Sequence, residues 1–460
     1  MASLTASLAV FLCLFPLLAL SDGGGKVGVN WGRIANDLPE PAKVVELLKA
    51  QGINRVKLYD TDSSVLTALA NSNISVVVAM PNELLSNAAS SQSFTDAWVQ
   101  SNISAHVPAT NIISIAVGNE VFVDPNNTTK FLVPAMTNVH ASLTKFNLTN
   151  IKISSPIALS CLANSYPTSS GSFKPELVDI AIKPMLDFLR KTDSALMVNA
   201  YPFFAYAANS DTIDLNYALL KDNSGVVDQA SGLKYTSLLE AQVDAVFYAM
   251  KALQYDDVKI SVTETGWPSA GDENEIGAGH DNAAAYNGNL VRRVLTGSGT
   301  PLKPDNALDV YLFALFNENQ KSGPTSERNY GLFYPNQKKV YDITLTGSDS
   351  VPINGSKVQI PATGQTWCVA SEKAGEEKLQ AGIDYACGEG GADCRPIQDG
   401  STCHDPNSLV AHASYAFNSY YQKKARATGT CDFGGAAYVV TQPPRFGTCE
   451  FPTGYFFFFF

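Results

Sequence analysis

Short apolar runs with β-strand character alternate with helix-like stretches through most of this chain, and this alternation limits its possible folds more than any other feature. There are eight such runs: Lys26–Asn30, Arg55–Asp60, Ile74–Met80, Ile112–Glu120, Ile151–Ala158, Ala195–Tyr201, Val258–Trp267 and Leu308–Asn319. Helix-like stretches between them include Glu40–Ala50, Phe131–Phe146, Pro175–Arg190, Tyr235–Leu253 and Ala283–Leu295. The runs are almost continuously apolar rather than alternating, which is typical of a parallel sheet covered on both faces.

Eight strand–helix units favour a closed (β/α)8 barrel of the TIM type over an open doubly wound sheet. We therefore predict an α/β fold with this barrel at residues 25–345. No Gly-x-Gly-x-x-Gly motif follows the first run, which removes the main sequence signal for dinucleotide binding. We expect no cofactor and no metal.

Composition narrows the possible partners. The chain has 460 residues, of which 45% are hydrophobic and 16% are charged, so it is expected to be globular. Its net charge of −11 argues against a nucleic-acid partner, because phosphate binding needs a clustered basic surface. We expect a monomer with no integral membrane span.

The N-terminus resembles a secretory signal peptide, which we place at residues 1–24. Its apolar run, Leu8–Leu20, is shorter than the helix of about 20 residues that spans a bilayer, and small residues follow it. The usual positive charge before that run is missing. A buried N-terminal helix is the alternative, but Cys13–Pro16 offers it no polar face. Glycosylation sequons at Asn73, Asn102, Asn126, Asn127, Asn147 and Asn354 fit a secreted, extracellular or cell-wall protein.

Cysteines mark a second region of the chain. Cys161 stands alone, whereas six cysteines lie between Cys368 and Cys449. In a secreted chain this density indicates a disulfide framework. A zinc site is the competing interpretation, but no Cys-x-x-Cys pair exists and the histidines are scattered.

The segment Thr344–Thr363 is rich in Gly, Ser, Asp, Pro and Asn, which is typical of a linker. We place the linker at residues 346–364 and a small disulfide-rich module at residues 365–452. A core of this size needs covalent cross-links. A lipid anchor is conceivable only for a chain that continues beyond Phe460.

Two glutamates lie at the ends of predicted strands. Glu264 follows Ile260–Thr263 and precedes Gly266-Trp267-Pro268, and Glu120 ends the run that starts at Ile112. A polar residue often caps a strand, so either glutamate alone would be ambiguous. Two carboxyl groups at the carboxyl end of one parallel barrel are what glycoside hydrolysis requires.

Three segments, Val117–Val121, Ile260–Ser269 and Phe316–Lys321, closely resemble plant endo-β-1,3-glucanases of glycoside hydrolase family 17. The resemblance extends from Val27 to about Tyr341. The C-terminal region, with Thr366-Trp-Cys-Val369 and its cysteine spacing, looks like a family 43 carbohydrate-binding module of the X8 type.

This resemblance implies a retaining hydrolase of internal β-1,3-glucosidic bonds, with Glu264 as nucleophile and Glu120 as proton donor. It implies that Asn119 binds the sugar 2-hydroxyl. Tyr201 is expected to donate a hydrogen bond to Glu264. Family positions are also matched by Glu318, Lys321 and Glu327. Lys321 would add positive charge to an acidic cleft, although a surface loop with ordinary salt bridges is the alternative for all three.

Aromatic side chains are candidate sugar platforms, although core packing is the commoner role of such residues. In the barrel the candidates are Tyr59, Tyr201, Phe204 and Trp267. In the module they are Trp367, Tyr415, Tyr420 and Phe433, and the sequence does not distinguish the exposed ones.

The resemblance also implies three disulfides, Cys368–Cys431, Cys387–Cys449 and Cys394–Cys403, with Cys161 free. The implied partner is a β-glucan polysaccharide. Two alternatives to an active β-1,3-glucanase remain open at this point. One is a non-catalytic glucan-binding wall protein, and the other is a mixed-linkage β-1,3;1,4-glucanase with the same fold and catalytic pair.

Overall fold

The structure is a computed structural model that describes residues 25–346, 366–371, 374–424, 426, 430–440, 444, 446–447 and 449–453. The chain divides into two compact units, Met1–Ser350 and Val351–Phe460. The signal peptide predicted at 1–24, the sequon at Asn354 and all but the first residue of the linker predicted at 346–364 lie outside the described residues.

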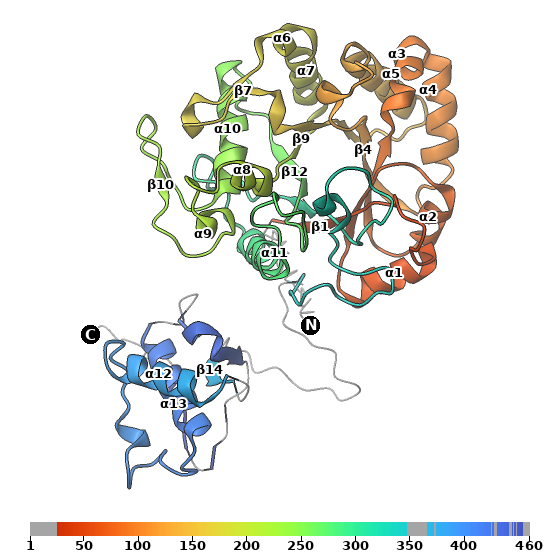
Figure 1. The fold of residues 1–460 in the computed structure, drawn as a ribbon. Coiled ribbons are helices and arrows are strands. Elements are labelled where there is room, and N and C mark those ends of the chain that lie inside the picture. The colour runs from red at the N-terminus through yellow and green to blue at the C-terminus, as the bar shows by residue number, and fades with distance from the viewer. Residues whose placement is uncertain are drawn as a thin grey trace, which may run out of the picture. The chain divides into compact units, whose positions relative to one another are not determined.

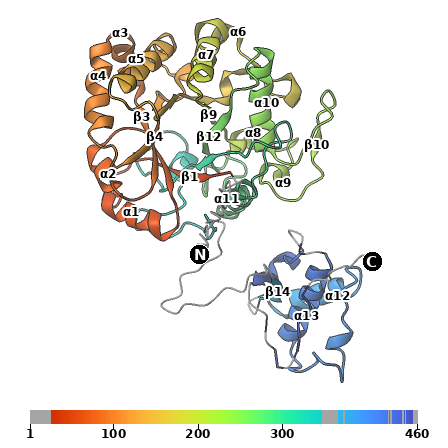
Figure 2. The same ribbon diagram turned by 180° about the vertical axis from the view of Figure 1, so that it is seen from behind.

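The first unit is built on a parallel sheet of nine strands in the order β5-β4-β3-β2-β1-β13-β12-β9-β6. The strands are β1 (Val27–Trp31), β2 (Arg55–Leu58), β3 (Ser75–Met80), β4 (Asn111–Val117), β5 (Lys152–Ser154), β6 (Pro156–Ala158), β9 (Leu196–Asn199), β12 (Ile260–Thr265) and β13 (Val310–Leu312). Only Ser155 separates β5 from β6, which stand at the two ends of this order, so the sheet closes on itself. Figures 1 and 2 show helices around this ring of strands. The predicted (β/α)8 barrel is confirmed, and the predicted strand Ile151–Ala158 is this pair of short strands.

Helices alternate with the strands along the chain, and most of them cover the outside of the ring. They are α1 (Pro41–Ala50), α2 (Ser63–Ala68), α3 (Leu85–Ser90), α4 (Gln92–Val99), α5 (Leu132–Lys145), α6 (Pro175–Leu177), α7 (Lys183–Thr192), α8 (Pro202–Ala208), α9 (Leu215–Ala218), α10 (Leu238–Ala252) and α11 (His280–Leu295). Side-chain caps start several of them: Asp62 accepts from the backbone of Ser64 and Val65, and Ser237 accepts from Glu240. No helix in the described part of the chain is long and apolar enough to cross a membrane.

Loops between these elements carry two small antiparallel pairs. In the first pair, β7 (Leu162–Asn164) lies next to β8 (Ser172–Phe173). In the second, β10 (Val226–Val227) lies next to β11 (Lys234–Tyr235).

Side chains alternate between two apolar layers of the barrel. Along β3, Val76, Val78 and Met80 belong to the large core that packs against the helices. Val77 and Ala79 instead belong to a small cluster with residues of β4, β9 and β13. Filling the interior with side chains from several strands makes the barrel a packed support rather than a pore, so function is expected at its rim.

The second unit contains helices α12 (Glu376–Cys387) and α13 (Leu409–Lys423) and the antiparallel pair β14 (Trp367–Ala370) and β15 (Ala437–Val440). Its core includes Cys368, Leu379, Ala413, Phe417 and Cys431. This core is small, and three disulfides reinforce it.

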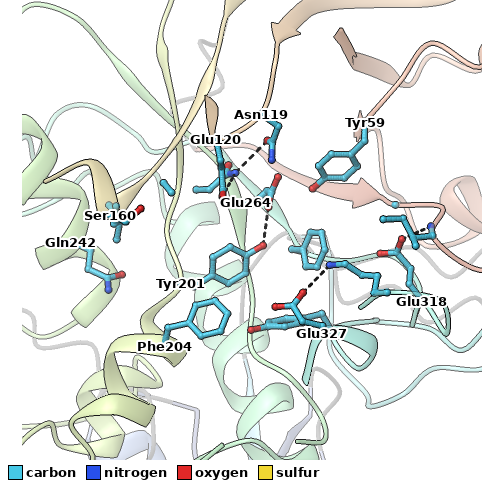
Figure 3. A pocket seen from close by; sticks show the side chains of 18 of the residues that line it. Tyr59, Asn119, Glu120, Ser160, Tyr201, Phe204, Gln242, Glu264, Glu318 and Glu327 are labelled. Atoms are coloured by element: carbon cyan, nitrogen blue, oxygen red, sulfur yellow. Dashed lines mark hydrogen bonds and ion pairs between the residues drawn. The ribbon is translucent and has the colours of Figure 1, made fainter. Parts of the chain in front are cut away.

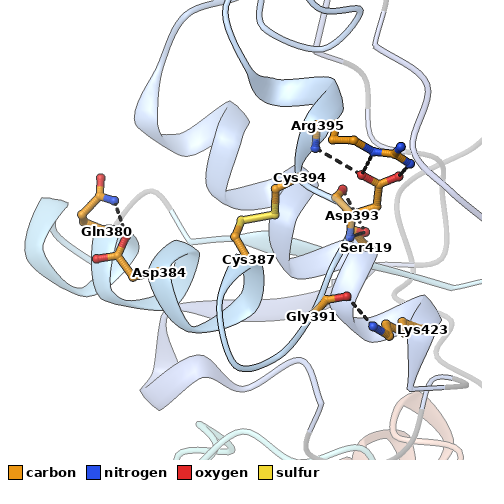
Figure 4. The surroundings of a disulfide bond; sticks show 9 residues. All are labelled: Gln380, Asp384, Cys387, Gly391, Asp393, Cys394, Arg395, Ser419 and Lys423. Carbon is orange, nitrogen blue, oxygen red and sulfur yellow. Dashed lines mark hydrogen bonds and ion pairs between the residues drawn. A yellow bond between two sulfur atoms is a disulfide. The ribbon is translucent and has the colours of Figure 1, made fainter.

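The disulfide pairing corrects two of the three expected bonds. Cys368 pairs with Cys431, as expected, but Cys387 pairs with Cys394 and Cys403 with Cys449. Helix α12 ends at Cys387, and the chain then reverses direction, so the Cα of Cys394 lies 5.7 Å from the Cα of Cys387 (Figure 4). This separation lies within the range that a disulfide spans. Cys161 is a buried free cysteine.

Candidate active site

A cleft of about 960 Å³ lies at the carboxyl ends of the barrel strands. Its walls come from residues that end or follow β1, β2, β4, β6, β9, β12 and β13. Figure 3 shows the side chains that converge there. Nine of the ten barrel residues expected in the site line this cleft: Tyr59, Asn119, Glu120, Tyr201, Phe204, Glu264, Glu318, Lys321 and Glu327.

Glu264 is held on both carboxylate oxygens. It lies in β12 and is buried. Its Oε1 is 2.7 Å from Lys57 Nζ, and its Oε2 accepts a hydrogen bond of 2.9 Å from the Tyr201 hydroxyl (Figure 3 shows the latter). The expected contact between Tyr201 and Glu264 is therefore present. A cation and a phenolic donor both favour the ionised form of a carboxyl group.

Lys57 projects from β2 and its side chain is fully buried. Besides Glu264, its Nζ lies 3.5 Å from Asn119 Oδ1 and 4.4 Å from the centre of the Tyr59 ring. A lysine this deeply buried needs a charged partner, and Glu264 supplies it. Lys57 therefore places a fixed positive charge below the floor of the cleft.

Glu120 is positioned by a sharp turn after β4. The strand ends at Val117, and both Gly118 and Glu120 have left-handed backbones, with φ of 70° and 50°. Asn82 clamps the turn, since its side chain accepts from the Asn119 N–H at 2.8 Å and donates to the Asn119 carbonyl at 3.0 Å. A positive φ is unusual for glutamate and costs about 1–3 kcal/mol, so the surrounding contacts must hold it in place.

Asn199, at the end of β9, connects the turn to the neighbouring strands. Its Nδ2 donates to Glu120 Oε1 at 2.9 Å and to Asn119 Oδ1 at 3.4 Å, while its Oδ1 accepts from the Thr263 hydroxyl at 3.0 Å. Burial raises the pKa of Glu120, and the nearby Glu264 charge raises it further, whereas the bond from Asn199 opposes them. The net effect is a raised pKa, which favours the protonated form of Glu120.

An aromatic wall surrounds these carboxyl groups. The rings of Tyr59, Tyr201 and Tyr330 all contact the ring of Phe313, with centre-to-centre distances of 5.5–6.3 Å. Burial, followed by the Glu264 charge, raises the pKa of both Tyr59 and Tyr201 well above the usual value. Both phenols therefore remain protonated and can act as donors. Phe204 stands next to Tyr201 at 5.5 Å and is 47% exposed.

Trp267 does not line the cleft, so its expected role as a sugar platform is wrong. Its side chain is fully buried and packs against Phe203 and Tyr286, with ring centres 5.4 and 5.5 Å away. Its Nε1 donates to the Gly277 carbonyl at 2.8 Å. Strand β12 ends at Thr265, and the chain then turns the indole into the core rather than toward the cleft.

The three charged residues expected after β13 do reach the cleft. Lys321 Nζ lies 3.0 Å from Glu327 Oε2 and 4.4 Å from the centre of the Phe313 ring. Glu318 is buried, and its Oε1 accepts from the Ile34 N–H at 2.7 Å. Burial raises the pKa of Glu318. A Cβ on Gly32 would come within 2.4 Å of Glu318 Oε2, so a larger residue there would displace this carboxyl group.

Sequence reasoning missed Lys57, Asn82 and Asn199. Lys57 carried a usable signal, because a lysine between Val56 and Leu58 in a strand expected to be buried is unusual. Asn82 begins a short 3-10 helix after β3, and nothing in its sequence surroundings connects it with Asn119. Asn199 lay within a predicted strand, and only the closed sheet brings it next to Glu120.

Two family models match the chain. Glycosyl hydrolases family 17 matches residues 27–345, and the X8 domain matches residues 366–438. Glucan endo-1,3-beta-glucosidase 13 of Arabidopsis thaliana is 43% identical over 434 residues, covering 94% of this chain and 86% of that protein. Glucan endo-1,3-beta-D-glucosidase of Olea europaea is 39% identical over 431 residues, covering 93% of each chain.

Two solved structures are similar to the first unit. CJP38, described as a beta-1,3-glucanase and allergen of Cryptomeria japonica pollen, has a TM-score of 0.67 and 41% identity, covering 70% of this chain and 100% of that one. A structure from a study of two plant beta-glucan endohydrolases with distinct substrate specificities has a TM-score of 0.64 and 40% identity, covering 69% of this chain and 99% of that one.

Proposed function

The chain belongs to glycosyl hydrolases family 17, and from this premise we propose that Glu264 and Glu120 are the two catalytic carboxyl groups of its cleft. The protein is an endo-β-1,3-glucanase, a glycoside hydrolase that cleaves internal β-1,3-glucosidic bonds with retention of configuration. One observation supports the assignment of roles: the same cleft gives one carboxyl group a cation and a phenolic donor, and raises the pKa of the other.

In the first step, the Glu264 carboxylate attacks the anomeric carbon of the sugar. The bond from that carbon to the bridging oxygen breaks, and Glu120 gives its proton to this oxygen. The raised pKa of Glu120 suits it to carry that proton, while Lys57 and Tyr201 hold the Glu264 carboxyl group through an ion pair and a hydrogen bond.

In the second step, Glu120 acts as a base instead of an acid. The Glu120 carboxylate takes a proton from water, and the resulting hydroxide oxygen bonds to the anomeric carbon while the bond to Glu264 breaks. The second glucan fragment leaves, and both carboxyl groups return to their starting states. Asn119, fixed by Asn82 and Asn199, is proposed to bind the 2-hydroxyl of the reacting sugar, a contact that strengthens in the transition state.

The remaining cleft residues are proposed to bind neighbouring glucose units. Phe204 and Tyr201 present aromatic surface at one wall, and Tyr59 lies beside the nucleophile. Glu318, Lys321 and Glu327 can bind sugar hydroxyls at another wall. Their charges also act on the catalytic pair, because the Glu327 charge raises the pKa of Glu120.

We assign hydrolysis to residues 25–345 and glucan binding to the X8-type module at 365–452. Binding by the module would increase the concentration of polymer near the cleft. We also propose that the protein is monomeric and secreted to the extracellular space or cell wall. The three disulfides and the exposed sequon asparagines Asn73, Asn126, Asn127 and Asn147 support secretion.

Substrate comparison tests the reaction. The protein is expected to hydrolyse laminarin, a soluble β-1,3-glucan, much faster than barley-type mixed-linkage glucan. A preference for the mixed-linkage polymer would reassign the specificity, and no turnover of either would favour a non-catalytic binding protein. This comparison is informative because a similar structure comes from a pair with distinct substrate specificities.

Two substitutions test the catalytic roles. Glu264→Gln should lower kcat on laminarin by more than about 10³-fold without unfolding the protein, because it removes the nucleophile. Glu120→Ala should slow release of a sugar leaving group far more than release of an activated aryl group, which needs no proton. Equal losses on both substrates would assign Glu120 a structural role.

A further inference from the structure

Three aromatic rings form a partly exposed cluster on the second unit. Tyr385 comes from α12, Tyr420 from α13, and Phe433 from the turn before β15. Their ring centres are separated by 5.6 Å for Tyr385 and Tyr420, 6.4 Å for Tyr385 and Phe433, and 5.5 Å for Tyr420 and Phe433. Tyr385 is 47% exposed, and the other two rings are partly exposed.

The cluster has a rigid base. Phe433 stacks on the fully buried Phe417 of α13, with ring centres 4.0 Å apart and ring planes 14° from parallel. Gly382 of α12 makes room for this pair, because a Cβ there would lie 2.6 Å from the Phe417 ring and 3.5 Å from the Phe433 ring. The Phe433 ring therefore rests on a fixed core side chain.

The backbone at Phe433 is held in an unfavourable conformation. Phe433 has φ of 45°, and Gly434 and Gly435 follow with φ of 66° and 79°. A left-handed conformation is rare for a bulky residue, and such strain is found most often at binding sites. Apart from atoms of its own chain neighbours, a Cβ on either glycine would meet no described atom within 4 Å, so both glycines face open space.

Polar groups accompany the rings. The hydroxyls of Tyr385 and Tyr420 lie 3.3 Å apart, and Lys424 Nζ lies 5.5 Å from the centre of the Tyr420 ring. An apolar surface edged by hydroxyl and ammonium groups suits a sugar, which has apolar C–H faces and a rim of hydroxyls. The other two aromatic candidates of the module, Trp367 and Tyr415, are buried and lie in its core.

We propose that Tyr385, Tyr420 and Phe433 form the surface by which the second unit binds a β-1,3-glucan chain. This inference rests on the proposed glucan-binding function of the module and identifies the residues that perform it. Glucose units would lie against the exposed rings, with the two tyrosine hydroxyls and Lys424 bonding their hydroxyl groups. The site is separate from the catalytic cleft, none of whose lining residues belongs to this unit.

Adsorption of the full-length protein to insoluble β-1,3-glucan tests the proposal. All variants carry Glu264→Gln so that the polymer is not digested. Tyr385→Ala is expected to weaken adsorption about tenfold, as expected for loss of an aromatic anchor. Tyr438→Ala is the matched control, because Tyr438 is 54% exposed on β15 but contacts no other ring among the described residues. It should adsorb like the parent.

A second variant tests the proposed binding surface without removing an aromatic ring. Gly434→Asn would place a side chain in the open space at the residue that follows Phe433, and asparagine tolerates a positive φ. It should also weaken adsorption, while thermal unfolding should show that both variants remain folded. When the same substitutions are made in the active protein, which keeps Glu264, none of them should change the hydrolysis of short soluble β-1,3-oligosaccharides.

Three results would overturn the proposal: normal adsorption of both Tyr385→Ala and Gly434→Asn, an equal loss in Tyr438→Ala, or no adsorption of the parent. The last would also reject glucan binding by the module. It would leave the proposed catalytic function intact if soluble oligosaccharides were still hydrolysed, so the two failures can be told apart.

Discussion

At the residue scale, Lys57 is the group that most clearly distinguishes the two carboxyl groups of the cleft. Its buried ammonium lies 2.7 Å from Glu264 Oε1, and its charge also lowers the pKa of Glu120. Neither effect requires contact with the sugar. Lys57 is therefore a positioning residue, which acts on the reaction through the two groups that carry it out.

Lys57→Met should lower kcat/KM on laminarin by about 10²-fold, because a preorganised charge next to the nucleophile is lost. The pKa of Glu120 would rise, because the Lys57 charge that lowers it is removed, so the alkaline limb of the pH profile should move to higher pH. The pH dependence of kcat/KM measures this limb.

Lys57→Arg is the control, since it retains a positive charge next to Glu264. It should keep the alkaline limb closer to its original position than Lys57→Met does. A purely structural role would lower activity at every pH and leave the shape of the profile unchanged. The methionine variant should also lose about 3 kcal/mol of stability at neutral pH, because a buried carboxylate loses its partner.

The sequence could identify Glu264 and Glu120 as candidate catalytic residues, because each lies within one short motif. It could not place contacts made across the barrel, because the bond from Asn199 to Glu120 depends on how the sheet closes. Trp267 was misplaced for a related reason: a strand-end aromatic can face the cleft or the core, and packing against Phe203 and Tyr286 decides between them.

At the scale of elements, the order of strands and helices could be predicted, but their ends could not. The run predicted to extend to Glu120 ends as a strand at Val117, because Gly118 turns the backbone. The helix predicted at Pro175–Arg190 is interrupted by a π-helical segment, Val178–Ile182, just before Pro184, which lacks the N–H that a continuous helix would use.

Gly118→Ala tests how far the catalytic turn depends on its glycine. A Cβ there would lie 2.5 Å from Val121 Cγ2 and 2.9 Å from Asn82 Oδ1, in a backbone with φ of 70°. The variant should lose more than about 2 kcal/mol in urea unfolding, since steric overlap adds to the strain. Activity should also fall, because Asn82 holds Asn119 and thereby Glu120.

Gly232→Ala separates the effect of backbone strain from that of steric overlap. Its φ is 72°, but an added Cβ would meet no described atom within 4 Å. It should cost only the backbone strain of about 1–2 kcal/mol and leave kcat unchanged. If both variants had the same effect on stability and activity, the turn at Gly118 would not be what positions Glu120.

Helix α10 contains a buried acid that should make stability depend on pH. Burial raises the pKa of Asp244 from 3.8 to about 6, although Leu302 donates its N–H to it at 2.8 Å. The folded state therefore holds this proton more tightly than the unfolded state. Its stabilising contribution is complete below about pH 4 and is lost as the pH rises through about 6.

Asp244→Asn removes this titration and keeps an oxygen that can accept from Leu302. The free energy of unfolding of the wild type, relative to that of the variant, should fall by up to about 3 kcal/mol between pH 4 and pH 7. Urea unfolding of both proteins at the two pH values measures the difference. A constant difference would show that Asp244 does not titrate in this range.

At the scale of the whole molecule, the two units have separate cores and separate means of stabilisation. Every residue of the large apolar core lies between Val27 and Leu345, whereas the clusters of the second unit lie between Trp367 and Phe451. The three disulfides all join cysteines of the second unit. Sequence composition could indicate this second unit, but the choice among cysteine partners depended on the turn after α12.

Truncation after residue 346 should therefore leave the barrel folded and its hydrolysis of short soluble β-1,3-oligosaccharides within about twofold of the intact protein, since no cleft residue is removed. Hydrolysis of insoluble β-1,3-glucan should fall about tenfold or more, because the enzyme is no longer held at the polymer. Initial rates on the two substrates measure the contrast.

Reduction of the disulfides in the intact protein provides an independent version of this test. The second unit has a small core and should lose its structure when its three cross-links are reduced, whereas Cys161 of the barrel is already free. Reduced protein should therefore behave like the truncated protein, active on soluble oligosaccharides and poor on the insoluble polymer. If truncation or reduction lowered both activities equally, the second unit would be stabilising the barrel rather than binding glucan.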